Sequence, residues 1–290
     1  MCRLYGFRSS VTSRVHRSLV DAENALARQS ERHRDGWGLA YYIGRFPHLI
    51  RNDQQALTDG LFADLSAVVA TRTFVAHIRQ ATVGEVSVLN CHPFQHGAWI
   101  LAHNGEIAGF GRDAELRREI MNAVDERFRG GILGRTDSEV LFHLFLSRLA
   151  RQVDDIQDLG VDAGRALAAL SETVETVLEI CRRYGRDGDC RLTVLLTNGS
   201  VMVGYRHRRE LFFSTYKTHC PDRESCHAFD ATRCEQPPRD GIVKHLIVAS
   251  ERLSDTGHVW QELADGEFVA VDHLMRVQRG RLGATADYEI

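Results

Sequence analysis

Two strand-rich regions of this sequence bracket a helical one, and this order most constrains the fold. Runs typical of strands lie at 3–7, 39–43, 74–79 and 99–103, and again at 192–196, 201–205, 211–214, 245–249, 268–271 and 275–278. Apolar residues at helical spacing predict helices over 17–32, 112–128, 136–151 and about 161–183. Because no linker rich in Pro, Gly or Ser interrupts the middle, we expect a single α+β domain over 2–290 in which sheets pack face to face inside helical layers.

Composition excludes several classes of partner. The chain has 290 residues and a formal net charge of -3, so nothing in its charge favours binding to nucleic acid or to an anionic membrane surface. An apolar run long enough to span a membrane and a signal-peptide pattern are both missing from the sequence, and the seven cysteines are irregularly spaced. We therefore expect a cytoplasmic protein that acts on a small molecule.

Cys2 follows the initiator methionine directly and precedes the first expected strand. Removal of Met1 would leave one residue that carries both a thiol and a free α-amine. In an unfolded peptide the thiol has a pKa of about 8.5 and the amine one of about 7.7–8.0, so the amine can serve as the base for its own thiol. The alternative is a buried, inert cysteine.

The strand at 74–79 places His77 and Arg79 on one face, because successive side chains alternate. An arginine on an inner face needs a partner, since an unpaired buried charge costs several kcal/mol. That partner is either an internal Asp or Glu or a carboxylate of the substrate. Upstream, the segment 33–38 contains Gly36 and Gly38, which allow positive φ or close backbone approach, and it is otherwise an ordinary loop between helix and strand.

The sequence contains two Asn-Gly pairs, and this dipeptide is typical of tight turns. Asn198-Gly199 separates two strand-like runs and predicts a tight hairpin. Asn104-Gly105 ends the run at 99–103, and the sequence by itself favours a hairpin there too. The functional alternative is an oxyanion hole, formed by the Asn104 side-chain amide and the Gly105 N–H.

Two further features have structural explanations that compete with functional ones. Asp137 stands at the start of an expected helix, where an acidic residue complements the helix N-terminus without any role in function. The segment 219–234 holds Cys220, Cys226 and Cys234, but their spacing matches no common structural zinc pattern. We expect a surface loop there, no metal site and no cofactor.

Six segments within about the first 140 residues have to be read together. They are Met1-Cys2-Arg3-Leu4, His33-Arg34-Asp35-Gly36-Trp37-Gly38, His77-Ile78-Arg79-Gln80-Ala81-Thr82-Val83-Gly84, Asn90-Cys91-His92-Pro93-Phe94, His103-Asn104-Gly105-Glu106 and Arg135-Thr136-Asp137-Ser138-Glu139. They occur in the order and approximate spacing of the class II glutamine amidotransferases, and the chain closely resembles the stand-alone members of that family. The strands after 185 would complete the sheets.

The resemblance implies a four-layer α/β/β/α fold of the N-terminal nucleophile hydrolase type. It also implies that Cys2 attacks a γ-carboxamide and forms a γ-glutamyl thioester that water then cleaves. Asn104 and Gly105 match the family's oxyanion hole. Arg79 matches the residue that binds the substrate α-carboxylate, and Asp137 the one that binds its α-amino group.

The resemblance leaves the leaving group open. The residues beyond the motifs are too few for a separate synthetase domain, so the expected activity is hydrolysis of glutamine or of a small γ-glutamyl compound. Ammonia released from glutamine could go to an ammonia-consuming partner subunit. The alternative function is a non-catalytic γ-glutamyl sensor or regulatory module, which is the expectation if Met1 is retained.

Overall fold

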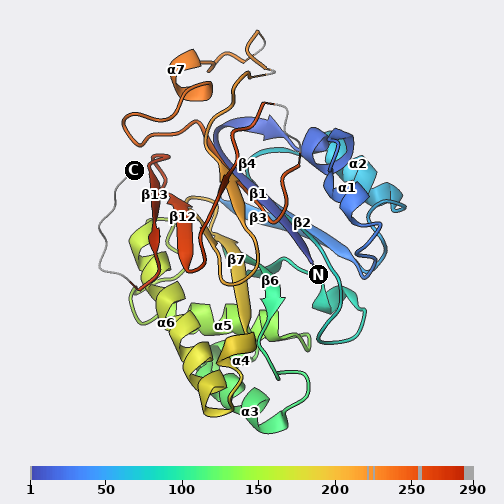
Figure 1. The fold of residues 1–290 in the computed structure, drawn as a ribbon, viewed down its shortest axis with the longest axis vertical. Coiled ribbons are helices and arrows are strands. Elements are labelled where there is room, and N and C mark those ends of the chain that lie inside the picture. Colours follow the sequence, from blue (N-terminus) through green and yellow to red (C-terminus); the bar gives the residue numbers. More distant parts are fainter. Residues whose placement is uncertain (1, 221, 225, 254–256, 284–290) are drawn as a thin grey trace.

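Two antiparallel sheets lie face to face in this computed structural model, which describes residues 2–220, 222–224, 226–253 and 257–283 (Figure 1). The first sheet has the order β11-β9-β10-β1-β4-β2-β3 and the second the order β13-β12-β8-β7-β6-β5. The strands of the first sheet are β1 (Arg3–Arg14), β2 (Trp37–Ile43), β3 (Phe46–Asn52), β4 (Ala70–Ile78), β9 (Phe212–Ser214), β10 (His245–Ala249) and β11 (Gln261–Glu262). Those of the second are β5 (Phe94–His96), β6 (Trp99–Glu106), β7 (Arg191–Thr197), β8 (Met202–Tyr205), β12 (Glu267–Val271) and β13 (Val277–Arg281).

Helices cover both outer faces (Figure 1). The first sheet packs against α1 (Leu26–Gln29), α2 (Gly60–Val68) and a single helical turn at Arg17–Asp21. The second packs against α3 (Ala114–Ala123), α4 (Glu126–Arg129), α5 (Asp137–Leu149) and α6 (Ala163–Arg183). Single turns at Val88–Asn90 and Asp187–Asp189 and the short α7 (Ala231–Cys234) lie in connections.

Strand alternation produces the layers. On β4, Val75 packs between the sheets, whereas Phe74 and Ala76 face α1 and α2. On β6, Ala102 packs between the sheets and Leu101 faces the helices. Each strand therefore supplies two cores, and the expected four-layer α/β/β/α arrangement is confirmed.

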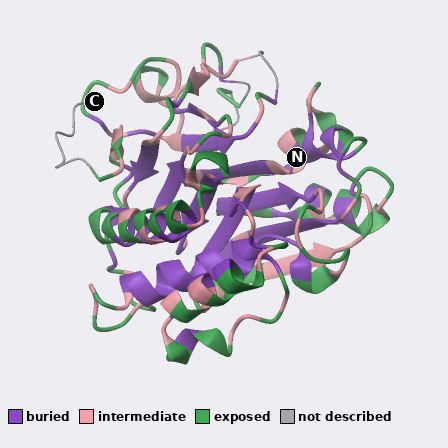
Figure 2. Ribbon diagram, turned by 60° about the horizontal axis from the view of Figure 1, so that its bottom comes forward, coloured by how far each residue is buried: buried purple, intermediate pink, exposed green. Residues whose placement is uncertain are grey.

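The helix α5 occupies the centre of the second helical layer, and every one of its residues is buried (Figure 2). The neighbouring α6 buries one face and exposes the other, as its apolar spacing predicts. The first residue of α5 is Asp137, so this buried helix carries that carboxylate into the interior.

Two expected helices are interrupted, and in each case a tertiary contact explains the break. The helix predicted over 17–32 ends at Asp21 and resumes at Leu26, because the Asn24 N–H donates to the carbonyl of Leu253 instead of continuing the helix. The helix predicted over 112–128 divides at Val124, where the chain is extended. The next N–H, that of Asp125, donates to Ser147 Oγ of α5. The sequence pattern also did not predict β3, β5 or α2.

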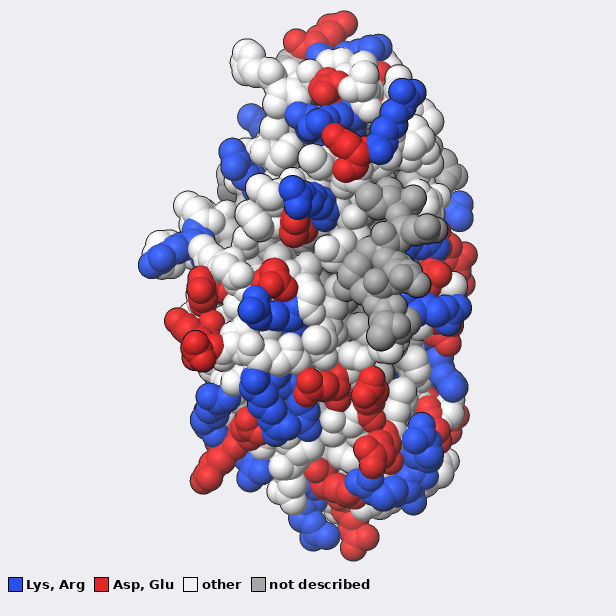
Figure 3. Space-filling model, turned by 90° about the vertical axis from the view of Figure 1, so that its left-hand side faces the viewer, with Lys and Arg blue, Asp and Glu red and all other residues white. Residues whose placement is uncertain are grey.

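Acidic and basic side chains are interspersed on the face shown in Figure 3, consistent with the small net charge. Across the described ranges, none of the helices combines the length and apolar character needed to cross a bilayer. The single-domain assignment over 2–290 stays a prediction, and its last seven positions lie outside the described residues.

Candidate active site

Cys2 lies at the beginning of β1, beside the end of β4. The strands are antiparallel and Arg3 pairs with Ile78, so Cys2 comes level with the residues that follow β4. The Gln80 N–H donates to Cys2 Sγ at 3.3 Å, and the thiol donates to the Gln80 carbonyl at 3.4 Å. The backbone of Gln80 therefore holds the sulfur in place. The sequence analysis assigned no role to Gln80, although it adjoins Arg79 in the same motif.

Arg79 is buried at 2% exposure, and its guanidinium is held by a neighbouring loop. Its terminal nitrogens donate to the carbonyls of Val83 (3.2 Å), Gly84 (3.3 Å) and Glu85 (3.0 Å). Within the described residues, Arg79 forms no ion pair with an Asp or Glu. The internal acidic partner considered from the sequence is therefore not seen there, and the charge is met by carbonyl dipoles.

The loop 33–38 forms hydrogen bonds with the residues that follow β4. The Arg79 N–H donates to the Gly36 carbonyl, and Asp35 Oδ2 accepts the N–H of Ala81 at 2.8 Å. Gly36 has φ +115°, and a Cβ there would lie 2.5 Å from Cys91 Sγ. A Cβ on Gly38 would overlap the carbonyl of His92. Both glycines are thus needed for positive φ or for close approach, as the sequence analysis proposed.

Asn104 and Gly105 do not form a hairpin, so that interpretation is wrong. The strand β6 continues through them to Glu106, with Asn104 opposite Thr193 and Gly105 opposite Leu192. A Cβ on Gly105 would overlap the carbonyl of Arg191, so the glycine permits close packing within the sheet. Asn104 is 5% exposed, and within the described residues no hydrogen bond of its side chain is recorded.

Asp137 is the first residue of α5 and is 3% exposed. Its Oδ2 accepts the N–H of Ile107, one residue past β6, at 2.6 Å, and its Oδ1 accepts the N–H of Ser138 at 2.9 Å. The helix cap itself is Thr136, whose hydroxyl accepts the N–H of Glu139. Asp137 is therefore not needed as the cap. Among the residues that the structure describes, it forms no ion pair.

A histidine bridge joins the two sheets at this end. His77 Nε2 of β4 lies 3.2 Å from the carbonyl of His103 on β6. His103 Nε2 lies 2.9 Å from the carbonyl of Arg191, so this nitrogen carries the proton and Nδ1 accepts from Ser138 Oγ at 2.8 Å. The strand that carries Asn104 is thereby tied to β4 and to the start of α5.

The charges of Arg79 and Asp137 both influence the pKa of the Cys2 thiol. Burial raises the pKa of the Cys2 thiol, the bond from Gln80 and the charge of Arg79 lower it, and the charge of Asp137 raises it. Burial also raises the pKa of Cys91 to about 11, which leaves that thiol protonated at neutral pH. Of these two cysteines, Cys2 is the more accessible and Cys91 is fully buried.

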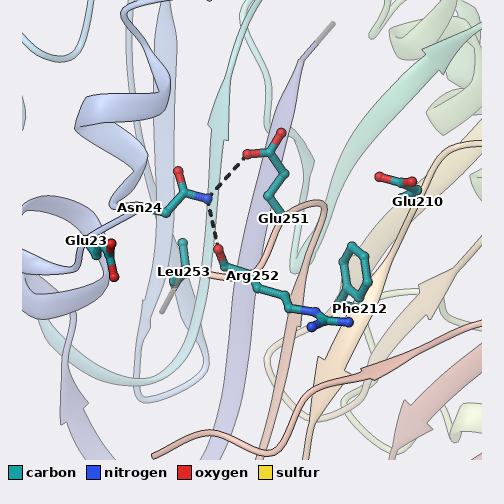
Figure 4. A pocket seen from close by; sticks show the side chains of 7 residues that line it. All are labelled: Glu23, Asn24, Glu210, Phe212, Glu251, Arg252 and Leu253. Atoms are coloured by element: carbon teal, nitrogen blue, oxygen red, sulfur yellow. Dashed lines mark hydrogen bonds between the residues drawn. The ribbon is translucent and has the colours of Figure 1, made fainter. Parts of the chain in front are cut away.

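An open cavity of about 520 Å³ is lined by residues that precede α1, by residues at the start of β9 and by residues that follow β10 (Figure 4). One lining residue, Glu251, forms an ion pair with Arg3 and accepts a hydrogen bond from Asn24. The neighbouring Ser250 exchanges two hydrogen bonds with the backbone of Leu4. The other residues that line the cavity are Glu23, Asn24, Glu210, Phe212, Arg252 and Leu253. The sequence pattern predicts a strand at 245–249, and no local motif marks Glu251.

No group of three or more His, Cys, Asp or Glu side chains is placed to hold a metal ion in the described part of the chain. The cysteine-containing segment 219–234 forms an irregular connection with the short α7. Positions 221 and 225 of that segment, like Met1, lie outside the described residues.

Face-to-face antiparallel sheets with a cysteine at the head of a central strand define an N-terminal nucleophile hydrolase fold. The chain aligns with a glutamine aminotransferase class-II domain protein from Silicibacter pomeroyi at a TM-score of 0.64 and 20% identity, covering 98% of this chain and 100% of that one. It aligns with glutamine phosphoribosylpyrophosphate amidotransferase from B. subtilis at a TM-score of 0.59 and 14% identity, covering 98% of this chain and 50% of that one.

The model of the family "Glutamine amidotransferases class-II" matches residues 1–286, and the chain belongs to that family. It is 26% identical over 230 residues to the "Probable glutamine amidotransferase DUG3" of Saccharomyces cerevisiae, covering 71% of this chain and 64% of the relative. It is 30% identical over 117 residues to a "Gamma-glutamyl-hercynylcysteine sulfoxide hydrolase" of Mycobacterium tuberculosis, covering 37% of this chain and 50% of the relative. Like these two, several further curated relatives are matched over little more than half of their length.

Proposed function

We propose that this protein hydrolyses the γ-glutamyl amide bond of glutamine or of a small γ-glutamyl compound, through a thioester on Cys2 after removal of Met1. One observation carries the proposal. Arg79 and Asp137 are both buried, both influence the Cys2 thiol, and neither has a counter-ion among the described residues.

The charges of Arg79 and Asp137 are complementary to the carboxylate and the ammonium of an α-amino acid. An isolated buried charge costs several kcal/mol unless a partner neutralises it. The α-carbon of a glutamyl group carries a carboxylate for Arg79 and an ammonium for Asp137, and its γ-carbonyl is then available to the thiol. We therefore assign Arg79 and Asp137 to substrate binding.

The chemistry follows from the raised pKa of the thiol. Because burial disfavours the thiolate, a base has to take the proton, and the α-amine of Cys2 is attached to the same residue. The sulfur attacks the γ-carbon, and the carbonyl oxygen gains negative charge that the Asn104 amide and the Gly105 N–H stabilise. The C–N bond breaks, the amine leaves with the proton, and water then releases glutamate and frees the thiol.

The comparisons support this class of reaction without naming the leaving group. One relative is named as a glutamine amidotransferase and another as a hydrolase of a γ-glutamyl compound. With glutamine, the leaving group is ammonia, and an ammonia-consuming partner subunit is then the expected acceptor. The cytoplasmic location remains a prediction from cysteine usage.

The test is covalent. A glutamine analogue with an electrophile at the γ position should label Cys2 stoichiometrically, and Cys2→Ala should lose both labelling and turnover. Equal labelling of Cys91 or Cys220 would contradict the assignment. The intact mass of the purified protein distinguishes the enzyme from the sensor alternative. Loss of one methionine supports the enzyme, whereas retained Met1 with ligand binding and no turnover supports the sensor.

A further inference from the structure

The two strands that flank β1, β4 and β10, both lead into residues that hold the Cys2 end of that strand. On the β4 side, the backbone of Gln80 binds Cys2 Sγ. On the β10 side, the Ser250 N–H donates to the carbonyl of Leu4 at 2.9 Å, and Ser250 Oγ accepts the N–H of Leu4 at 3.0 Å. Glu251 comes directly after Ser250, so its carboxylate is carried to the start of β1.

Arg3 connects this carboxylate to the backbone of Cys2. Its Nη1 donates to the carbonyl of Cys2 at 3.2 Å, and its Nη2 forms an ion pair with Glu251 Oε1. Glu251 Oε2 accepts the side-chain amide of Asn24 at 3.3 Å, and the same amide nitrogen donates to the carbonyl of Arg252 at 2.8 Å (Figure 4). The ion pair is therefore anchored at both ends, on Cys2 and on Asn24.

The same ion pair balances the charge next to the α-amine that removal of Met1 would create. Bond lengths keep an amine nitrogen within about 3.6 Å of the carbonyl oxygen of its own residue, so Arg3 Nη1 lies within about 7 Å of the Cys2 nitrogen. A cation at that distance lowers the pKa of an amine, and an anion paired with the cation offsets this effect. The other charged or titratable groups around Cys2, Arg3 and Glu251 are His33, Arg79, Asp137 and Arg209.

We propose that Arg3 and Glu251 are positioning residues for the nucleophile, whose ion pair fixes the Cys2 backbone and balances the charge beside its α-amine. This inference rests on the proposed function, in which that amine takes the thiol proton. Because Gln80 holds the sulfur and Arg3 holds the backbone, the amine and the thiol of Cys2 keep one relative orientation. Because Glu251 neutralises Arg3, the amine stays basic enough to take the proton.

The test follows the rate at which a chloroketone analogue of glutamine labels Cys2, measured by intact mass from about pH 5 to 9 on chains that have lost Met1. The rate should rise with pH as the amine loses its proton. Glu251→Gln leaves Arg3 unbalanced, so the midpoint of this rise should move down by about 0.5–1 pH unit. Arg3→Gln leaves the carboxylate unbalanced, so the midpoint should move up by a similar amount.

A matched control and a double variant sharpen the test. Glu23→Gln should keep the natural midpoint, because it removes the same charge from an exposed residue that lines the same cavity. The double variant of Arg3→Gln and Glu251→Gln removes both charges and should return close to the natural midpoint. A merely structural role would instead lower the rate at every pH and leave the midpoint in place.

The inference is wrong if Cys2 is labelled normally and Glu251→Gln leaves the midpoint unchanged, a result that decides the question even if Arg3→Gln does not fold. Shifts of the two single variants in the same direction would also overturn it. If the analogue does not label Cys2 of the natural protein and no γ-glutamyl compound is cleaved, the proposed function fails and the inference fails with it.

Discussion

The two Asn-Gly pairs of this chain have the same local sequence and opposite structural roles. Asn198-Gly199 ends β7 in a turn: Gly199 has φ +86°, and Asn198 Oδ1 accepts the N–H groups of Ser200 and Val201, both at 2.9 Å. Asn104-Gly105 lies within β6 and is paired with β7 along its length. There the side chain of Asn104 has no recorded partner among the described residues.

The two asparagines differ in what their side chains do. Asn198 uses its acceptor oxygen locally, as turn asparagines do, and so it contributes to stability. Asn104 is buried beside the bridge of His77 and His103, and its amide is available to a ligand. The buried Nδ2 of Asn198 also has no partner among the described residues, so an unpaired amide alone does not distinguish the two asparagines, and the proposed role of Asn104 in the oxyanion hole rests on its motif.

The largest expected effect comes from Asn104→Ala. Loss of one oxyanion donor should lower kcat by about 10²- to 10³-fold, which corresponds to about 2.7–4 kcal/mol. The free energy of unfolding should change little, because no internal hydrogen bond is lost. Steady-state kinetics and urea denaturation measure the two quantities. A large loss of stability with unchanged kcat per folded molecule would show that Asn104 has a structural role and not a catalytic one.

Next come the two charges that we propose bind the glutamyl end. Asp137→Asn and Arg79→Lys should each lower kcat/KM by about 10- to 150-fold, equivalent to about 1.5–3 kcal/mol. Lysine should not rescue Arg79, because a point charge cannot reproduce the two-pronged guanidinium. Asp137→Asn should also lose most of its discrimination against an α-acetylated substrate. If both variants lost thermal stability and yet discriminated like the natural protein, the two residues would be structural.

Asn198→Ala is the structural counterpart of Asn104→Ala. It removes the acceptor of two backbone N–H groups, and we expect a loss of about 1–2 kcal/mol in the free energy of unfolding. The kcat of the folded protein should stay within about twofold of its natural value, by the same assays. A loss of kcat comparable to that of Asn104→Ala would mean that the hairpin shapes the site.

The last prediction concerns the pH dependence of stability contributed by His77 at the bridge. Burial lowers its pKa to about 3, from an ordinary value of about 6.5. Between these values the unfolded chain binds a proton that the folded chain does not, so stability falls as pH drops below about 6.5. His77 should contribute up to about 1.4 kcal/mol per pH unit, and His77→Gln should reduce the slope of unfolding free energy between about pH 6 and 4. An unchanged slope would show that His77 is protonated in the folded protein.

Much of the fold could be predicted because it rests on periodicity. The alternation of Phe74, Val75 and Ala76 indicates a strand with two buried faces, and the apolar spacing of α5 and α6 indicates helices. The interruptions at 22–25 and at Val124 could not be predicted, because their backbone groups bond to Leu253 and Ser147, which lie far along the chain. Local propensity does not report such partners.

The candidate site residues could likewise be predicted from their residue type and their order along the chain, but their tertiary contacts could not. Cys2, Arg79, Asn104, Gly105 and Asp137 could be chosen because their chemistry and order match a family pattern. Gln80 and Glu251 could not, because a backbone contact to a thiol and an ion pair with the distant Arg3 leave no mark in local sequence.

The sequence by itself determined the layers of this protein and its candidate nucleophile, because hydrophobic period and residue chemistry are local properties. Tertiary structure alone decided which Asn-Gly pair turns and which remains in a strand, since Gly105 is held against the carbonyl of Arg191 across the sheet. It also decided that Arg79 and Asp137 are buried, influence the pKa of the same thiol and have no counter-ions among the described residues. Charge pairing depends on distances in space, and those distances exist only once β1, β4, β6 and α5 have packed together.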